Sequence, residues 1–213
     1  MKTPQESALL TLRTLYPELE HERFVATAQK RESTPSPDPA HCTRCALHIG
    51  RRCPVIARGS EAARVVFVGD FPSDEDDETG LPLSGAPGQL LDKMIAAMNL
   101  GPDDVFVTTL TKCRPPRTHT PSEEEILACG PHLEAQLQRL SRARWIVALG
   151  ERAAQTLSAS RASIHALRKE PFRFRGLRGF ATYHPRSVLE DAGLKRPTWE
   201  DLKQVMAAME DRS

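Results

Sequence analysis

Residues 64–69 read Arg-Val-Val-Phe-Val-Gly, and this stretch decides the fold class. Four consecutive apolar residues end at a glycine, which is typical of a short strand buried on both faces of a parallel sheet. Three further runs have the same form and are also bounded by turn residues: 105–110 (VFVTTL), 145–149 (WIVAL) and 179–183 (GFATY). We therefore predict four strands.

Helical patterns follow the first three strands, at 88–98, 122–140 and 151–157. A last helix is expected at 198–209, with Thr198 as its N-cap. Strands that alternate with helices predict a parallel sheet covered on both faces. The expected fold class is α/β, a three-layer αβα domain with a central four-stranded, mainly parallel sheet.

The first 40 residues differ in character from the rest of the chain. Apolar residues at helical spacing predict an amphipathic helix at 6–16, and three prolines predict an extended linker at 31–40. We therefore expect an N-terminal helix and Pro-rich linker over 1–40 and one globular domain over 41–213. Because there is no apolar run of about 20 residues and no signal peptide, we expect a cytoplasmic protein that does not enter a membrane.

The net charge of +1 does not by itself indicate a nucleic-acid partner. The charges are unevenly distributed, however, since residues 161–196 carry nine Lys or Arg and three acids, whereas 74–78 is an acidic run. The basic segment can contact phosphates, or it can be an ordinary solvated surface.

Five cysteines stand at positions 42, 45, 53, 113 and 129. Because two of them form a C-x-x-C pair in a chain without an export signal, metal or cluster ligation is favoured over disulfides. The candidate ligands are Cys42, Cys45, Cys113 and Cys129, while Cys53 is expected to be a plain thiol. Zinc and iron–sulfur clusters both accept four thiolates, so the spacing leaves both open.

Several short segments occur together in a fixed order. They are 42–47 (CTRCAL), 80–91 (GLPLSGAPGQLL), 112–116 (KCRPP), Cys129, 148–150 (ALG), 182–185 (TYHP) and 194–202 (LKRPTWEDL). In this order and spacing they resemble the motifs of the iron–sulfur, or family 4, uracil-DNA glycosylases, over about residues 42–209.

The resemblance implies the uracil-DNA glycosylase fold and a 4Fe-4S cluster held by the four candidate cysteines. It also implies DNA as the partner, single- or double-stranded, and a monomer that acts in base excision repair.

Asp70 and His184 are the catalytic residues that the resemblance implies. The family usually has Gly-Glu-Ala-Pro-Gly after the first strand, and 69–73 read GDFPS here, so the acid is kept as Asp70. Asp70 would place water or stabilise a cationic sugar, although a carboxylate at a strand end can equally cap a helix or pair with Arg. His184 would stabilise the departing base anion.

Leu83, Thr109 and Phe71 are the expected base contacts. The family has a stacking aromatic at the position of Leu83, and stacking is worth about 1–3 kcal/mol per base. Phe71 is either a replacement ring or a core residue. The family reads the uracil edge with Asn at the position of Thr109, whose hydroxyl does not offer a donor and an acceptor in that planar arrangement. Uracil specificity is therefore not implied.

Six further residues are candidate DNA contacts: Ser84, Gly85, Gly88, Arg114, Arg117 and Arg186. The three small residues would let a phosphate approach backbone amides at the start of a helix. Arg114 and Arg117 are phosphate binders or solvated loop side chains. Arg186, where the family has a small residue, binds a phosphate or fills the pocket and pairs with Asp70.

The sequence therefore predicts a DNA glycosylase that cleaves the N-glycosidic bond of uracil or of another deaminated or damaged base, with a structural cluster. The alternative is an iron–sulfur DNA-binding relative with weak or no glycosylase activity, because Leu83 and Thr109 lack the usual base-recognition chemistry. A zinc-stapled nucleotide-binding protein is a more distant alternative.

Overall fold

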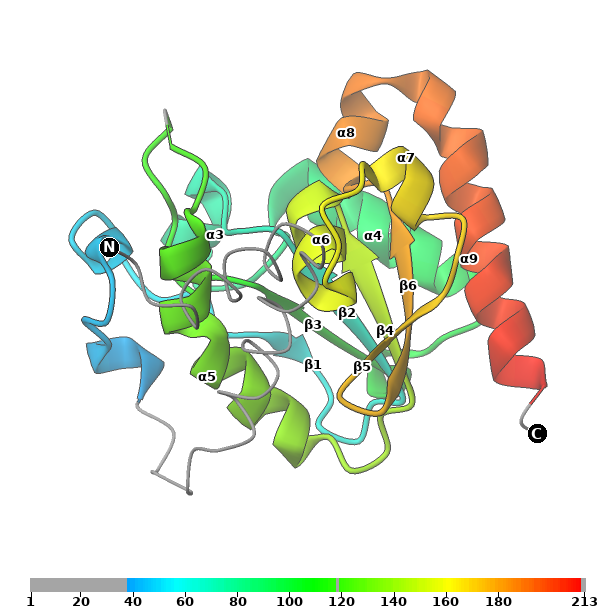
Figure 1. Cartoon of the computed structure of the whole chain (residues 1–213), viewed down its shortest axis with the longest axis horizontal. Coiled ribbons are helices and arrows are strands. Elements are labelled where there is room, and N and C mark those ends of the chain that lie inside the picture. The colour runs from blue at the N-terminus through cyan, green and yellow to red at the C-terminus, as the bar shows by residue number, and fades with distance from the viewer. Residues whose placement is uncertain (1–37, 118, 212–213) are drawn as a thin grey trace, which may run out of the picture. The chain divides into compact units, whose positions relative to one another are not determined.

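The structure is a computed structural model that describes residues 38–117 and 119–211 (Figure 1). The helix predicted at 6–16 and most of the linker predicted at 31–40 lie outside the described residues. Among the helices that are described, none has the length and apolar character that crossing a membrane requires.

The sheet has six strands, β1 (Arg58–Gly59), β2 (Val65–Gly69), β3 (Val105–Thr109), β4 (Trp145–Leu149), β5 (Phe172–Phe174) and β6 (Leu177–Thr182). They lie in the order β1-β3-β2-β4-β6-β5. The four predicted strands are the parallel ones in the middle, β3, β2, β4 and β6. The expected number of four was wrong, because a short antiparallel strand is added at each edge.

The two edge strands escape sequence prediction because they are short and contain charged residues. β1 has two residues, and β5 reads Phe-Arg-Phe. β5 joins β6 in a tight hairpin whose two turn residues, Arg175 and Gly176, have φ values of 51° and 81°. Two consecutive residues with positive φ match the right-handed twist of a two-residue hairpin.

The longer helices are close to their predicted ranges: α4 (Gly85–Ala97), α5 (Glu123–Arg139), α6 (Glu151–Ser158) and α9 (Lys195–Glu210). The shorter ones are α3 (Asp74–Thr79), α7 (Ile164–Leu167) and α8 (Pro185–Glu190), with 3₁₀ turns at Pro39–His41, Ala46–His48, Pro102–Asp104 and Ala192–Leu194. Thr198 was wrong as an N-cap, because α9 begins three residues earlier and buries Thr198 in its second turn.

Helices cover both faces of the sheet. Alternate strand residues such as Phe67 and Val147 pack with Leu91 of α4 and Leu202 of α9 in the main hydrophobic core. The opposite face carries Thr108, whose hydroxyl donates to Gln136 of α5 at 2.9 Å, and α6 contacts β4 (Figure 1).

The four parallel strands end at the same level. Gly69 is in register with Thr109 and with Leu149, and Leu149 is in register with Thr182. β3 lies on one side of β2 and β4 lies on the other, so the chain crosses over β2 between them. The carboxyl ends of β2 and β4 therefore flank the switch point where α/β sheets usually bind ligands. The residues that follow these ends form the candidate site.

Candidate functional site

A pocket of about 140 Å³ lies at the carboxyl edge of the sheet. Its walls come from the loop after β2, the loop before α4, and the start of α8. The lining residues are Asp70, Phe71, Pro72, Ser73, Asp76, Leu83, Ser84, Pro87, His184, Arg186 and Ser187. Most of the predicted site residues are therefore brought together, although they come from segments more than 110 residues apart in the chain.

Gly69 marks the point at which three of these predicted residues converge. A β-carbon added to Gly69 would lie 3.3 Å from Cδ1 of Leu83 and 3.3 Å from Cγ2 of Thr109. It would also lie 3.7 Å from Nε2 of His184. The last residue of β2 is thus surrounded by a leucine methyl, a threonine methyl and an imidazole nitrogen.

The hydrogen bond made by His184 fixes its tautomer. Nδ1 accepts from the backbone N–H of Arg186 at 3.1 Å, as the cap of helix α8. Burial, together with the nearby Arg186 cation, lowers the pKa of His184 to about 4. The imidazole is therefore neutral at pH 7, and its one proton is on Nε2, the nitrogen near Gly69.

Asp70 lies against the turn between β4 and α6. Its Oδ1 accepts from the backbone N–H of Ala153 at 2.7 Å, and a β-carbon added to Gly150 would lie 2.4 Å from Oδ2. Gly150 carries no side chain that could cap α6, so Asp70 does this from the loop after β2. Burial raises the pKa of Asp70 to about 7, opposed by the Ala153 hydrogen bond and by Arg152.

Asp76 connects the two loops that form the rim of the pocket, a role that sequence reasoning missed. One carboxylate oxygen accepts from Ser73 N at 2.9 Å, and the other accepts from Ser84 N at 2.6 Å. In the sequence, the acidic run at 74–78 indicated only a local concentration of negative charge. Leu83, just before Ser84, has a positive φ of 51°, so the loop is held in a conformation that few side chains adopt.

Thr109, predicted as a base contact, is buried and is not among the residues that line the pocket. Its Oγ1 donates to the carbonyl of Thr111 at 2.8 Å, which leaves the methyl group facing Gly69. The carbonyl of Thr109 accepts from Nζ of Lys112 at 2.7 Å, and Lys112 also donates to Thr108 Oγ1 at 2.5 Å. Burial lowers the pKa of this fully buried lysine to about 8.

The glycines at the start of α4 have close protein neighbours. A β-carbon at Gly88 would lie 1.7 Å from the carbonyl oxygen of Leu83, so the fold itself requires a glycine there. At Gly85, where φ is 64°, the nearest group is the carboxylate of Glu75. Phosphate contacts at Ser84, Gly85 and Gly88 remain a prediction, and Glu75 would have to move to permit one at Gly85.

The three candidate DNA-binding arginines have different surroundings. Arg114 is half-buried and pairs with Asp74 at 3.1 Å and with buried Asp77 at 3.4 Å. Arg117 is 84% exposed and pairs with Asp74 at 2.8 Å. Arg186 is exposed at the pocket mouth, and because Asp70 bonds to the α6 backbone, the suggested pairing of Arg186 with Asp70 is not formed.

A buried ion pair supports the segment that precedes His184. Asp201 accepts from Thr182 Oγ1 at 2.7 Å and pairs with Arg168 at 2.8 Å. The Arg168 guanidinium lies 5.2 Å from the centre of the Tyr183 ring. Asp201 is thus a tertiary contact between α9 and β6.

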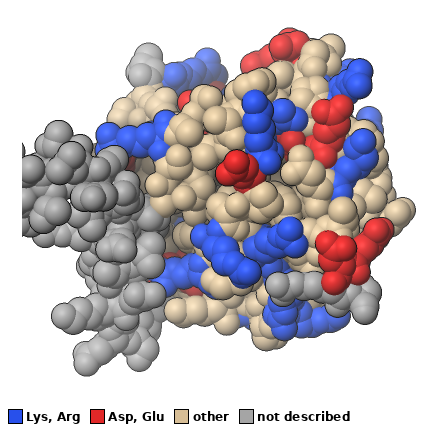
Figure 2. Space-filling model, turned by 45° about the vertical axis from the view of Figure 1, so that its right-hand side comes forward, with Lys and Arg blue, Asp and Glu red and all other residues tan. Residues whose placement is uncertain are grey.

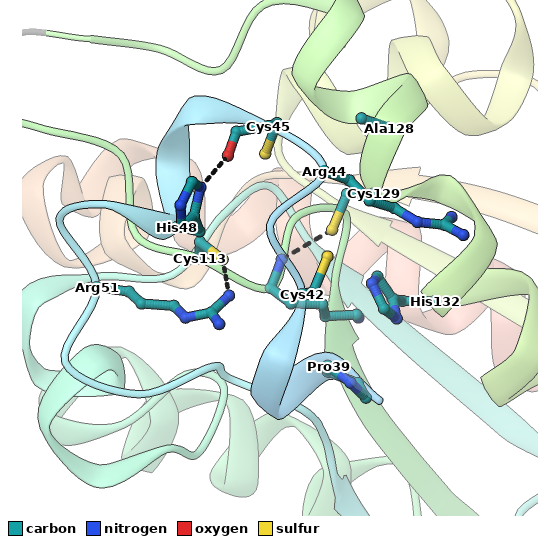
Figure 3. A pocket seen from close by; sticks show the side chains of 11 residues that line it. Pro39, Cys42, Arg44, Cys45, His48, Arg51, Cys113, Ala128, Cys129 and His132 are labelled. Carbon is teal, nitrogen blue, oxygen red and sulfur yellow. Dashed lines mark hydrogen bonds between the residues drawn. The ribbon is translucent and has the colours of Figure 1, made fainter. Parts of the chain in front are cut away.

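The four cysteines proposed as ligands line a second cavity (Figure 3). Cys42 and Cys45 come from the N-terminal loop, Cys113 follows β3, and Cys129 lies in α5. The remaining lining residues are Pro39, Arg44, His48, Arg51, Lys112, Ala128 and His132. Cys53 is not among them, and its Sγ donates to the carbonyl of Asp77 at 2.9 Å.

Donors from the protein already point at two of these sulfur atoms. Arg51 donates to Cys113 Sγ at 3.1 Å, and the backbone N–H of Lys112 donates to Cys129 Sγ at 3.2 Å (Figure 3). Burial raises the pKa of the Cys129 thiol to about 11. In the described part of the chain, no three His, Cys, Asp or Glu side chains are arranged to hold a single metal ion.

The charged surface is mixed. Figure 2 shows Lys and Arg side chains grouped over one face, with Asp and Glu side chains between the groups. Exposed basic residues of the 161–196 segment include Arg161, Lys169, Arg173, Arg186, Lys195 and Arg196. The predicted basic segment is thus accessible to solvent.

Comparison with known proteins identifies the chain's relatives. Residues 56–203 match the family model described as the uracil DNA glycosylase superfamily. The type-4 uracil-DNA glycosylase of Thermotoga maritima is 35% identical over 167 residues, which cover 76% of this chain and 86% of the relative. The type-4 enzyme of Archaeoglobus fulgidus is 34% identical over 175 residues, covering 77% and 86%. A type-5 uracil-DNA glycosylase of Pyrobaculum aerophilum is 32% identical over 170 residues, covering 72% and 74%.

Proposed function

Because the chain belongs to the uracil DNA glycosylase superfamily, we propose that it is a DNA glycosylase that hydrolyses the N-glycosidic bond of uracil or another deaminated base. The observation that carries this proposal is the convergence of His184 and its neighbours around Gly69, next to Asp70, in an open pocket. An enzyme of this kind must hold an extruded base and stabilise the negative charge that develops on it.

His184 is suited to stabilising the negative charge that develops on the departing base. His184 lines the pocket, and its proton is on Nε2, near Gly69, because Nδ1 accepts from the backbone N–H of Arg186. A neutral imidazole donor placed where an oxyanion develops stabilises the transition state without giving up its proton. His184 therefore acts as an electrophile toward a carbonyl oxygen of the departing base.

Asp70 supplies a negative charge that can act on a cationic sugar or on the attacking water. Its Oδ1 is held by Ala153, and this fixes the direction of the carboxyl group. When ionised, the carboxylate stabilises a cationic sugar or accepts a proton from the attacking water. These two roles require the deprotonated form, which the raised pKa of Asp70 makes incomplete near pH 7.

The second candidate function is DNA binding with weak or no glycosylase activity. The observation in its favour is that Leu83 and Thr109 present methyl groups at Gly69, in place of a ring and an amide. Phe71 lines the same pocket and is the available replacement ring. We expect an outcome between the two candidate functions, in which uracil is excised weakly and another base is preferred.

The proposed cofactor is a 4Fe-4S cluster bound by Cys42, Cys45, Cys113 and Cys129. The cavity fits such a group because four sulfur atoms surround it and Arg51 and Lys112 already donate to two of them. A cluster takes one thiolate on each iron, so its ligands need not converge on one atom as zinc ligands do. When bound, the cluster fastens the N-terminal loop to β3 and α5.

One experiment tests the proposed activity. Purified protein is incubated with oligonucleotides that carry a single uracil, hypoxanthine or xanthine, in single- and double-stranded form. We expect base release from at least one of them, abolished by His184→Ala. Salt-dependent DNA binding without release of any base would support the second candidate function and contradict the first.

A further inference from the structure

His132 is the one cavity-lining side chain in the described residues that is buried with both ring nitrogens unpartnered. It lies in α5, three residues after Cys129, and it is 2% exposed. Figure 3 shows its ring beside the side chains of Cys42 and Cys129. A buried polar group is costly unless it has a hydrogen-bond partner, so its environment calls for an acceptor.

Two other nitrogen-bearing side chains at this cavity, those of His48 and Arg51, have partners already. Nδ1 of His48 is bonded to the carbonyl of Cys45 at 2.7 Å. Arg51 donates to Cys113 and to the carbonyl of Ala40. His132 differs from these two neighbours because neither of its ring nitrogens has a partner, and the side chains of Cys42 and Cys129 lie beside its ring (Figure 3).

We propose that His132 donates a hydrogen bond to the iron–sulfur cluster, at an inorganic sulfide or a cysteine sulfur, and thereby raises the reduction potential of the cluster. This inference rests on the proposed cofactor. A neutral imidazole always carries one N–H, and the cluster supplies the acceptor that the ring lacks. A donor at a cluster sulfur stabilises the added electron, and hydrogen bonds of this kind are among the features that set cluster potentials.

The test compares two replacements of the same ring. His132→Phe keeps the planar volume and removes the N–H, whereas His132→Gln keeps an N–H donor. By spectroelectrochemical titration, we expect the Phe variant to be reduced at a more negative potential and the Gln variant to remain closer to the unaltered protein. The matched control is His48→Phe, which changes a histidine of the same cavity whose Nδ1 already has a partner and should not shift the potential comparably.

Iron and acid-labile sulfide are measured first in the unaltered protein, so that failure of the proposed cofactor is recognised separately. If the Phe variant retains full iron content and an unchanged potential, the inference is wrong. The inference is also wrong if the reduction potential of the Gln variant shifts as far as that of the Phe variant.

A second measurement is made on the unaltered protein, with His48→Phe as its control. The cluster of the unaltered protein is reduced with dithionite, and pulsed electron paramagnetic resonance is recorded after ¹⁵N labelling of histidine. We expect hyperfine coupling to a histidine nitrogen and to a proton that exchanges in D₂O, and both should persist in His48→Phe. Absence of this coupling would overturn the inference.

Discussion

Oδ1 of Asp70 accepts a 2.7 Å hydrogen bond from the backbone N–H of Ala153, so the carboxyl group that is proposed to take part in catalysis also caps helix α6. The two interpretations that the sequence left open, a catalytic acid and a helix cap, are therefore compatible. The cap fixes the position of the carboxyl group, and burial raises its pKa to about 7.

The raised pKa predicts how Asp70 affects stability. Its folded pKa lies above the ordinary value of 3.8, so the folded state binds the proton more tightly and the contribution of Asp70 to stability is full below about pH 4. That contribution is lost as the pH rises to about 7. Asp70→Asn stays neutral and keeps an acceptor for Ala153, so its stability relative to the unaltered protein should increase between pH 4 and pH 7.5. Urea unfolding across this range measures it, and a constant difference would contradict the raised pKa.

The same pKa predicts the pH dependence of base release. If ionised Asp70 is required, the single-turnover rate should rise with pH and level off above an apparent pKa near 7. His184 is neutral throughout this range and adds no step, because its pKa is about 4. Asp70→Asn should be slow and should lose the rising limb. A rate that does not vary between pH 5.5 and pH 8.5 would remove Asp70 from the chemistry.

Restoring the usual base contacts should raise uracil excision. Leu83→Phe supplies a stacking ring and Thr109→Asn supplies an amide, each worth about 1–3 kcal/mol, so the double variant should gain roughly two powers of ten or more in rate. The gain should disappear when His184→Ala is added. If the double variant does not improve, Arg186→Ser in the same background tests whether Arg186 obstructs the pocket. Robust uracil excision by the unaltered protein would show that Phe71 or another group already supplies these contacts.

Arg114 and Arg117 form a matched pair for testing DNA contacts. Arg117 is 84% exposed, so Arg117→Gln should shallow the plot of log affinity against log salt by up to about one unit. Arg114 is held by Asp74 and Asp77, so Arg114→Gln should lower the unfolding midpoint and leave the slope nearly unchanged. Fluorescence anisotropy at several salt concentrations gives the slopes, and equal slopes for all three proteins would exclude Arg117 as a phosphate contact.

The cysteines allow a comparison of the same substitution inside and outside the cavity. Anaerobically purified protein should be brown and absorb broadly near 400 nm, as expected of thiolate-bound iron–sulfur clusters. Cys113→Ala should lose iron and lower the unfolding midpoint, because cluster binding contributes to folding. Cys53→Ala should keep both, since its sulfur bonds to the carbonyl of Asp77 instead. Colourless protein with stoichiometric zinc and no iron would disprove the cluster.

The sequence by itself determined the parallel centre of the sheet, the longer helices and most of the pocket. Buried parallel strands are nearly continuous apolar runs, so 64–69 and 145–149 are visible without a structure. Because the carboxyl ends of parallel strands lie at one edge of the sheet, the motifs that follow those ends must lie close together as well. The two edge strands and short helix α3 have no such pattern, and they were not predicted.

Only the tertiary structure decided what individual polar groups do. Whether Asp70 caps a helix, which nitrogen of His184 carries the proton, and whether His132 has a partner all depend on atoms from distant segments. Sequence spacing specifies which face of an element a residue occupies. It does not specify burial or hydrogen-bond partners, and these determine the pKa and the chemistry of each group.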